Sequence, residues 1–376
     1  MILQQIQLSD FRNYTNAQVD FDSGVSAIIG ANGQGKTNLT EALAFLSTMK
    51  SFRGVPTEAM IRTGTQTAFI RARVLHDDGR EIVIEARLTN QGRNQVLVNG
   101  TKLPKARDLL GMVRTTVFSP DDLDLVKGGP HLRRDFLDDS LVAYANKYDA
   151  LRLEVDRIVR QRNAVLKQSG GRINNAVSSM LDLWDEKFSD LGTQLGNARN
   201  ELITKLTPFI THAYEELAQR ESNISIDYSP EWLQIGLAKC LTNSRDEDLR
   251  RFVTTVGPHR DDVEILINNL QARTHASQGE QRTMALALRL ALHRFIGQSV
   301  GEIPILILDD VLSELDPNRA RALINHFPVG QVLITTASDL PVDAHITKRV
   351  LIKAGTVIST PKLGDKNSTD GIDIHD

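Results

Sequence analysis

Two different periodicities of hydrophobic and polar positions predict where this chain forms sheet and where it forms helix. Near the start, Ile2, Ile6 and Leu8 have the even spacing of a half-buried strand. Between residues 67 and 99, apolar positions alternate with polar ones, and glycine-containing dipeptides separate the runs where hairpins need positive φ. We therefore expect an antiparallel meander of about three strands in this stretch.

In the middle of the chain, the spacing of apolar residues becomes that of amphipathic helices. Apolar residues recur at alternating spacings of three and four from Leu141 to Val165, with Arg162 as the polar exception, and again from Val177 to Leu202. Residues 167–172 lie between the two runs and contain a helix-breaking turn. The pattern predicts an antiparallel helical hairpin with arms about 45 Å long. Two interpretations stay open: a protruding, lid-like hairpin, or two ordinary core helices of a helical subdomain.

Short apolar runs alternate with helical patterns at both ends of the chain. Residues 25–29 predict a buried strand that leads through a glycine-rich loop into a helix over 37–49. Residues 305–308 and 332–336 predict two further buried strands. Helices are expected from residue 280 to about 295 and near 317–325, so the two ends of the chain indicate an α/β fold.

The glycine-rich loop has the sequence Gly30-Ala31-Asn32-Gly33-Gln34-Gly35-Lys36-Thr37, which fits G-x4-G-K-[ST]. Its glycines let backbone N–H groups surround phosphate, and the helix N-terminus adds partial positive charge. Lys36 is expected to neutralise the β- and γ-phosphates, and Thr37 to ligate Mg²⁺. We expect ATP rather than GTP, because the only guanine-type motif, at residues 146–149, falls inside a predicted helix.

Two acidic residues, Asp309 and Asp310, directly follow the apolar strand at 305–308. Such a strand delivers its acids at the carboxyl edge, where open α/β sheets bind ligands. Asp309 is expected to hold Mg²⁺, directly or through water, and Asp310 to accept a proton from the attacking water or to orient it. Lys36 and Asp310 are therefore the candidate catalytic residues.

Two further motifs flank this strand. Upstream, Ser277 offers an N-cap hydroxyl to the helix that opens in the segment Ser277-Gln278-Gly279-Glu280-Gln281. In isolation this segment indicates only a helix N-cap, but the helix leads directly to the acidic strand. Downstream lies the segment Ser313-Glu314-Leu315-Asp316.

This order of motifs resembles the ABC-type ATPases of the SMC kind, and among them the RecF family. The more specific blocks are LSDFRNY at residues 8–14, FSPDDL at 118–123 with VKG and RRDFLD soon after it, and GPHRDD at 257–262. The resemblance covers essentially residues 1–360.

The resemblance implies that residues 30–37 are a Walker A motif, 305–310 a Walker B motif, 277–281 the ABC signature and 313–316 the D-loop. In that superfamily the signature of one subunit completes the ATP site of another, which implies an ATP-dependent homodimer with Ser277 at the γ-phosphate in trans. It also implies that Arg12 takes part in nucleotide binding.

The implied fold is an ABC-type ATPase head, a mixed sheet plus an antiparallel β meander, with a helical second lobe containing a short antiparallel hairpin. The expected parts are an ATPase lobe at 1–125, a helical lobe at 126–255, completion of the ATPase lobe at 256–360 and a flexible tail at 361–376.

Three positions depart from the family pattern. Glu280 stands where the signature usually has glutamine, and Asp310 where most ABC ATPases have glutamate. Thr335-Thr336 occupy the place of the switch histidine. Together they suggest slow hydrolysis, which suits a switch better than a motor.

The function implied by the resemblance is that of a weak, DNA-stimulated ATPase in recombinational repair and replication-fork maintenance. ATP would drive head-to-head dimerisation on DNA, and hydrolysis would reset the dimer. The protein would assist RecA loading at gapped or damaged DNA together with RecR, and support the SOS response. The alternatives are an ABC-type subunit that energises another complex, such as a transporter, and a P-loop kinase, which would leave the signature unused.

Charge limits where DNA can bind, because the formal net charge of the 376 residues is −3. Residues 151–172 hold six basic residues against two acidic ones, a balance of +4, and residues 50–73 hold a second basic set. The candidate DNA contacts are Arg53, Arg62, Arg71, Arg73, Arg152, Arg157 and Arg160. A solvated face is the alternative for each set. We expect backbone recognition of duplex, junction or gapped DNA.

The cysteine content and the hydropathy of the sequence indicate the cellular compartment of the protein. The single cysteine, Cys240, cannot form an internal disulfide, which favours a reducing environment. No run approaches the roughly 18 apolar residues of a membrane span. We therefore expect a cytoplasmic protein without a membrane partner.

Overall fold

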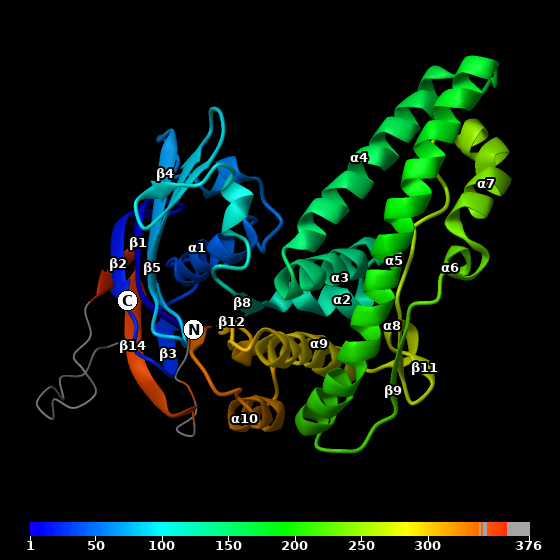
Figure 1. Cartoon of the computed structure of the whole chain (residues 1–376). Coiled ribbons are helices and arrows are strands. Elements are labelled where there is room, and N and C mark those ends of the chain that lie inside the picture. The colour runs from blue at the N-terminus through cyan, green and yellow to red at the C-terminus, as the bar shows by residue number, and fades with distance from the viewer. Residues whose placement is uncertain (338–339, 341–343, 359–376) are drawn as a thin grey trace, which may run out of the picture. The chain divides into compact units, whose positions relative to one another are not determined.

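The computed structural model describes residues 1–337, 340 and 344–358 and divides into two compact units (Figure 1). Unit 1 comprises Met1–Pro120 and the chain from Glu302, and unit 2 comprises Asp121–Gly301. The predicted tail at 361–376 lies outside the described residues. Among the described helices, none is long and apolar enough to cross a membrane.

Unit 1 contains an antiparallel sheet in the order β2-β1-β4-β5-β6-β7. Its strands are β1 (Ile2–Phe11), β2 (Tyr14–Asp20), β4 (Thr67–Leu75), β5 (Glu81–Thr89), β6 (Gln95–Val98) and β7 (Thr101–Lys102). Alternate residues of β4, from Ala68 to Val74, are buried, which is the period-two burial expected of a sheet with one solvated face. The predicted meander over 67–99 is confirmed by β4, β5 and β6.

The second sheet of unit 1 has the order β15-β14-β3-β13-β12-β8. Its strands are β3 (Val25–Ile29), β8 (Thr115–Phe118), β12 (Ile305–Asp309), β13 (Val332–Thr336), β14 (Ile346–Lys353) and β15 (Thr356–Ile358). All neighbours are parallel except β14 and β15. The strands predicted at 25–29, 305–308 and 332–336 are therefore confirmed, and they lie next to one another.

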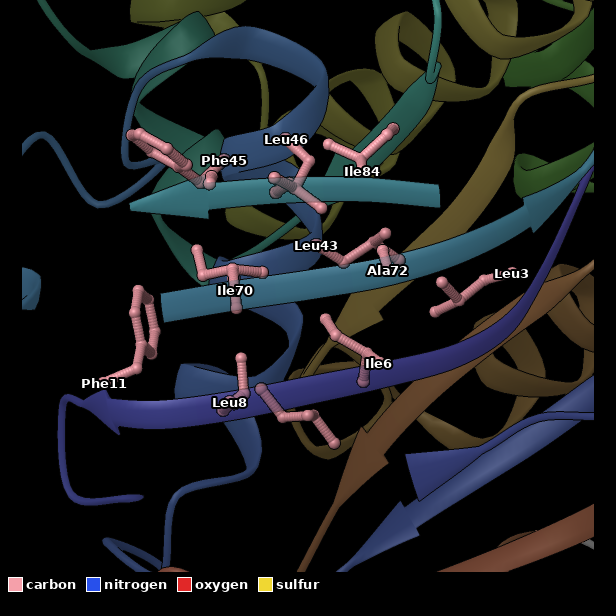
Figure 2. Close-up of a cluster of buried hydrophobic side chains, with 14 of the residues drawn as sticks. Leu3, Ile6, Leu8, Phe11, Leu43, Phe45, Leu46, Ile70, Ala72 and Ile84 are labelled. Carbon is pink, nitrogen blue, oxygen red and sulfur yellow. The ribbon is translucent and has the colours of Figure 1, made fainter. Parts of the chain in front are cut away.

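Helix α1 (Lys36–Thr48) lies between the two sheets, since it contacts β1 of the first sheet and β8, β12 and β13 of the second. Figure 2 shows its Leu43, Phe45 and Leu46 among side chains of β1, β4 and β5. Burial of each such side chain contributes roughly 1.5–3 kcal/mol. This packing fixes the N-terminal end of α1 beside the carboxyl ends of the parallel strands. The remaining short elements of unit 1 are η1 (Thr57–Met60), η2 (Ala106–Leu109), η4 (Leu312–Glu314) and α10 (Pro317–Asn325).

Unit 2 is mainly helical. Its helices are α2 (Asp124–Lys127), α3 (Pro130–Tyr144), α4 (Lys147–Gln168), α5 (Asn175–Ala218), α6 (Glu231–Ile235), α7 (Leu237–Arg251), α8 (Ala272–His275) and α9 (Gln278–Val300). A small antiparallel sheet joins β9 (Ile224–Asp227), β10 (Glu264–Ile267) and β11 (Leu270–Gln271).

Helices α4 and α5 form the predicted antiparallel hairpin, but its arms are unequal (Figure 1). At 1.5 Å per residue the 22 residues of α4 span about 33 Å and the 44 residues of α5 about 66 Å. The expectation of one continuous first arm from Leu141 is wrong, because Ala145 is extended and separates α3 from α4. Since α7 and α9 pack on α5, much of the hairpin lies in the core of unit 2, as the second interpretation has it.

The boundary between the units differs from the predicted division at residue 256. Residues 256–301 belong to unit 2, and the chain returns to unit 1 only at Glu302. The reason is the packing of α9 on α5 and α3, where the Phe295 ring lies 6.0 Å from that of Phe209 on α5 and 5.4 Å from that of Tyr144 on α3. The signature segment therefore lies in the helical unit.

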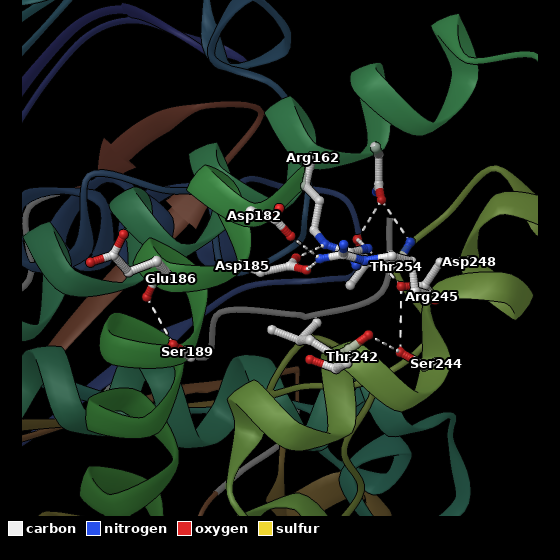
Figure 3. Close-up of polar contacts among 12 residues, drawn as sticks. Arg162, Asp182, Asp185, Glu186, Ser189, Thr242, Ser244, Arg245, Asp248 and Thr254 are labelled. Atoms are coloured by element: carbon white, nitrogen blue, oxygen red, sulfur yellow. Dashed lines mark hydrogen bonds and ion pairs between the residues drawn. The ribbon is translucent and has the colours of Figure 1, made fainter. Parts of the chain in front are cut away.

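Arg162, the polar member of the predicted helical seam, is fully buried. Its Nε donates to Asp185 Oδ1 at 2.6 Å and its Nη1 to Asp248 Oδ2 at 2.6 Å. Nη1 also donates to the Thr254 hydroxyl at 3.0 Å. Figure 3 shows how this one guanidinium links α4, α5, α7 and the segment after α7. Arg162 therefore belongs to the scaffold and not to a basic surface.

Candidate nucleotide site

The glycine-rich loop connects β3 to α1 in the way its sequence predicts. Gly35 is the N-cap of α1 with φ 116°, and Gly33 has φ 79°, both in the left-handed region that glycine tolerates. Gly30 is required for a different reason, because a Cβ there would lie 2.3 Å from the Ile352 carbonyl oxygen on β14. The glycines thus permit both the turn and its close approach to the sheet.

Lys36 lies at the start of α1 with only 5% of its surface exposed. Its Nζ donates to the Gly30 carbonyl at 2.7 Å and to the Ala31 carbonyl at 3.0 Å. Burial lowers the pKa of Lys36, and the nearby carboxylates of Asp310 and Asp309 act in the opposite direction. The loop and the acidic strand therefore share one electrostatic site.

The turn after β1 supports the loop from one side. Asn13 Nδ2 donates to the Gln34 carbonyl at 3.0 Å, and the Tyr14 hydroxyl donates to the Gly35 carbonyl at 2.9 Å. Burial raises the pKa of Tyr14, so the phenol stays a donor. In the sequence, the FRNY block at residues 11–14 was notable only for its family resemblance. In the structure, two of its side chains support the phosphate-binding loop.

The turn between β14 and β15 supports the loop from the other side. The Gly355 N–H donates to the Gln34 carbonyl at 2.9 Å, and the Ala354 N–H donates to Gln34 Oε1. Sequence reasoning missed this contact, because the partners are some 320 positions apart and the β14–β15 turn carries no motif. Gln34 is thus held by backbone from a distant part of the chain.

Asp309 ends β12 among three threonine hydroxyls. Its Oδ1 accepts from Thr335 Oγ1 at 2.8 Å and from Thr40 Oγ1 at 3.3 Å, and the Thr37 hydroxyl lies close to this carboxylate. Burial raises the pKa of Asp309, the three hydroxyls lower it, and the adjacent Asp310 raises it. The structure therefore brings together Thr37 and Asp309, the pair predicted as metal ligands.

Asp310 has a left-handed backbone, with φ 51°. Its N–H donates to Thr335 Oγ1 at 2.9 Å, and its carbonyl accepts from the Ser313 hydroxyl at 2.7 Å. Sequence reasoning noted Thr335 only as the residue standing where a histidine was expected. In the structure, Thr335 bonds both acids.

Arg12 and Arg53 line an open cavity of about 520 Å³ beside the loop. The other lining residues are Asn13, Gly33, Gly35, Lys36, Thr37, Asn38, Ala59, Ile61 and Thr63. Arg12 is fixed by two 2.7 Å bonds to the fully buried Glu41 and one of 2.8 Å to the Ala59 carbonyl. Arg53, which stays a predicted DNA contact, also lies at this cavity, with its Nη1 3.4 Å from Asn38 Oδ1.

The predicted D-loop directly follows the acid pair. Ser313 and Glu314 lie in the short η4, and Leu315 precedes the N-cap of α10, which is Asp316. The Asp316 carboxylate accepts from the N–H groups of Asn318 and Arg319 at 3.1 Å each, and this hydrogen bonding lowers its pKa. This segment therefore has a well-defined backbone in unit 1.

The predicted signature opens α9 in unit 2. Ser277 and Glu280 form a capping box, in which the Ser277 hydroxyl accepts from the Glu280 N–H at 3.3 Å and Glu280 Oε2 accepts from the Ser277 N–H at 2.9 Å. Arg220 forms an ion pair with Glu280, whose pKa is lowered chiefly by the Ser277 N–H. The presence of glutamate at position 280 is therefore explained by its role as the capping partner of Ser277.

The remaining signature residues divide between core and surface. Gln281 is buried, and its Nε2 donates to the Ala272 and Arg273 carbonyls at 2.9 and 3.1 Å. Ser277 and Gln278 are exposed, and Gly279 is half-exposed. The helix thus presents its first turn to solvent while Gln281 anchors it.

The DNA candidates of unit 1 carry acidic neighbours. Arg71 and Arg73 project from β4 and pair with Glu85 and Glu81 of β5 at 3.3 and 3.5 Å. Arg62 pairs with Asp10 at 3.4 Å. Arg71 and Arg73 are exposed and Arg62 is half-buried, but each acid cancels a charge that the sequence count treated as free.

The basic stretch 151–172 of unit 2 offers less surface charge than its balance of +4 indicates. Arg152 is only 11% exposed and is held by Asp139 and Asp149 at 2.8 and 2.9 Å. Arg157 pairs on the surface with Glu154, and Arg160 is exposed. With Arg162 buried, the outward-facing part of this patch on α4 is reduced to Arg157 and Arg160 among the named candidates.

Comparison with known proteins places this geometry in a family. The RecF/RecN/SMC N-terminal domain family matches residues 2–350. The DNA replication and repair protein RecF of Acidothermus cellulolyticus is 37% identical over 373 residues, which are 95% of this chain and 99% of that protein. RecF of Streptomyces avermitilis is also 37% identical, over 374 residues with the same coverage.

Solved structures agree with the sequence relatives. The recombination mediator protein RecF-ATP of the RecFOR pathway has a TM-score of 0.88 at 32% identity, covering 96% of this chain and 97% of that one. An SMC head bound to the C-terminal winged-helix domain of ScpA has a TM-score of 0.59 at 17% identity, covering 97% and 98% of the two chains, and is similar in fold alone. These likenesses confirm the predicted mixed α/β fold of an ATPase head with helical regions.

Proposed function

Because the chain belongs to the RecF family of DNA replication and repair ATPases, we propose that it is an ATP-driven DNA clamp of recombinational repair. The observation that carries this proposal is that the glycine-rich loop, Lys36 and the acid pair Asp309–Asp310 lie together in unit 1. The carboxylates of Asp309 and Asp310 act to raise the pKa of Lys36 against the effect of burial, and the Thr37 hydroxyl lies close to Asp309. A phosphate-binding loop beside an acidic strand end is the arrangement that phosphoryl transfer from a nucleoside triphosphate requires.

Each site residue has a defined task in this proposal. The loop N–H groups and Lys36 hold the phosphates, and Asp310 orients the attacking water or accepts its proton. Thr37 and Asp309 supply one hydroxyl and one carboxylate, a donor set that Mg²⁺ accepts alongside phosphate oxygens and water. When bound, Mg²⁺ neutralises charge on the phosphate oxygens. Arg53 adds positive charge at the cavity, where Arg12 is paired with Glu41.

The signature completes the site in trans in a head-to-head homodimer. Its exposed Ser277 and the first N–H groups of α9 form a helix N-terminus, which favours anions such as a γ-phosphate. ATP then joins two copies, and slow hydrolysis separates them. DNA stimulates turnover, and the clamp assists RecA loading with RecR at gapped or damaged DNA in the cytoplasm and supports the SOS response.

The test is sedimentation of the full chain with duplex DNA, at varied ATP and salt. We expect ATP to convert monomer to dimer and DNA binding to weaken steeply with salt, because phosphate contacts release counterions. Lys36→Arg abolishes the ATP-driven dimer, and Asp310→Asn traps it. Ser277→Arg spares ATP binding but blocks dimerisation. A Ser277→Arg protein that dimerises fully refutes the trans site.

A further inference from the structure

Thr335 lies at the end of β13 directly opposite Asp309 of β12. Its side chain is completely buried in unit 1. Oγ1 donates to Asp309 Oδ1 at 2.8 Å and accepts from the Asp310 N–H at 2.9 Å. The Thr335 hydroxyl therefore donates its proton to the Asp309 carboxylate and accepts the backbone N–H of Asp310 with a lone pair.

This contact matters because of the conformation of Asp310. With φ 51°, Asp310 has a left-handed backbone, which a non-glycine residue adopts rarely and keeps only where its surroundings hold it. Its N–H is held by Thr335 and its carbonyl by Ser313. The direction of the Asp310 carboxylate follows from that backbone, so it depends on the Thr335 hydroxyl.

We propose that Thr335 is a positioning residue for ATP hydrolysis, whose hydroxyl fixes the Asp309 carboxylate and the strained backbone of Asp310 together. The inference rests on the proposed function, since it concerns the step that Asp310 serves. Thr335 acts through the two acids and has no contact of its own with the nucleotide in this role. It couples β13 to the acidic end of β12 at the place where the family resemblance led us to expect a histidine.

The proposal is tested with two substitutions, one that keeps the volume of threonine and one that keeps its hydroxyl. Thr335→Val keeps the shape but removes both hydrogen bonds, whereas Thr335→Ser keeps the hydroxyl. Steady-state ATPase, binding of a fluorescent ATP analogue, and sedimentation with ATP are measured on the full chain. Because small misplacements at a reacting centre cost about ten- to a hundredfold in rate, we expect that loss in kcat for Thr335→Val. KM and analogue affinity stay within about threefold, and the ATP-bound dimer accumulates.

Thr40→Val provides the matched comparison, because Thr40 Oγ1 reaches Asp309 at 3.3 Å, while the Asp310 N–H is bonded to Thr335. We expect it to slow turnover clearly less than Thr335→Val. Thr335→Ser is expected to restore turnover to within about threefold of the unchanged protein, since it retains the donor and the acceptor.

The outcomes separate this inference from the proposed function. An unchanged protein that neither binds the analogue nor hydrolyses ATP refutes the proposed function itself. If the unchanged protein is active, the inference is overturned by a Thr335→Val protein with normal kcat. It is overturned equally if Thr335→Ser has as low a kcat as Thr335→Val, or if Thr335→Val no longer binds ATP. It is also overturned if Thr40→Val lowers kcat as much as Thr335→Val does.

Discussion

Replacing Arg162 by methionine should destabilise unit 2 strongly. The Arg162 guanidinium bonds Asp185 and Asp248 at 2.6 Å each, and both Arg162 and Asp248 have side chains that are 0% exposed. Methionine fills similar space but removes the positive charge. Asp185 retains Arg245 as a partner, whereas the remaining donors to Asp248 among the described residues are neutral, such as Thr255.

The magnitude follows from leaving Asp248 buried without a cation. Breaking a buried pair by removing one partner costs about 3–5 kcal/mol, because the desolvation penalty of the remaining charge is no longer offset. With a urea m-value of about 2 kcal/mol per molar, this corresponds to a fall of roughly 2 M in the unfolding midpoint. A double variant that also carries Asp248→Asn should recover part of the loss, since it removes the orphaned charge.

Tryptophan fluorescence is well suited to this measurement. The chain has two tryptophans, Trp184 and Trp232, and both lie in unit 2. Urea unfolding followed by fluorescence therefore reports on the unit that contains Arg162, even if the two units unfold separately. Trp184 is on α5 and Trp232 on α6, so the signal covers the packing around the hairpin.

Arg157→Met is the matched control, since Arg157 lies on the same helix but is 53% exposed and pairs with Glu154 at the surface. Surface pairs contribute little, so we expect no measurable change in its midpoint. An Arg162→Met protein that unfolds at the same urea concentration as Arg157→Met refutes the reasoning. So does a double variant with Asp248→Asn that is no more stable than Arg162→Met alone.

Three further predictions concern the loop and the signature. Gly30→Ala places a methyl group 2.3 Å from the Ile352 carbonyl oxygen, so we expect ATP affinity by equilibrium titration to fall about a hundredfold. Gln34→Ala removes one hydrogen bond from the β14–β15 turn and should weaken ATP binding about fivefold in the same titration, while the thermal unfolding midpoint barely changes. The pKa of Glu280 is lowered in the folded chain, so its cap stabilises α9 above the ordinary glutamate pKa and is lost as pH falls through the lowered value. Glu280→Gln should therefore flatten the acid side of the stability–pH curve, and an unchanged curve would contradict the capping role of Ser277 and Glu280.

Local patterns in the sequence predicted the elements that short-range rules control. The meander over 67–99, the strand at 305–308 and the loop at 30–37 follow from periodicity and glycine spacing, and the structure has each of them. The candidate site was predictable to the same extent, because Lys36 and Asp309 belong to motifs with fixed spacing. The roles of Thr335 and Gln34 were not predictable, since each depends on partners brought close by folding.

Charge counting overstated the surface charge of residues 151–172 for the same reason. Residues 151–172 contain an excess of basic side chains, but Arg152 is held by Asp139 and Arg162 by Asp185 and Asp248. A linear count gives every arginine equal weight. Only the packing of the helices decides which charges are neutralised inside and which reach solvent, because a buried charge must be paired whereas an exposed one is hydrated.

The sequence by itself determined the phosphate-binding loop, the acidic strand end and the capped signature helix, because each is encoded by neighbours a few residues apart. The tertiary structure alone decided that Thr335 bonds both acids, that the β14–β15 turn holds Gln34 and that residues 256–301 join the helical unit. The physical reason is that hydrogen bonding and burial depend on distance in space, and the chain brings these groups together only when the two sheets and the helices pack.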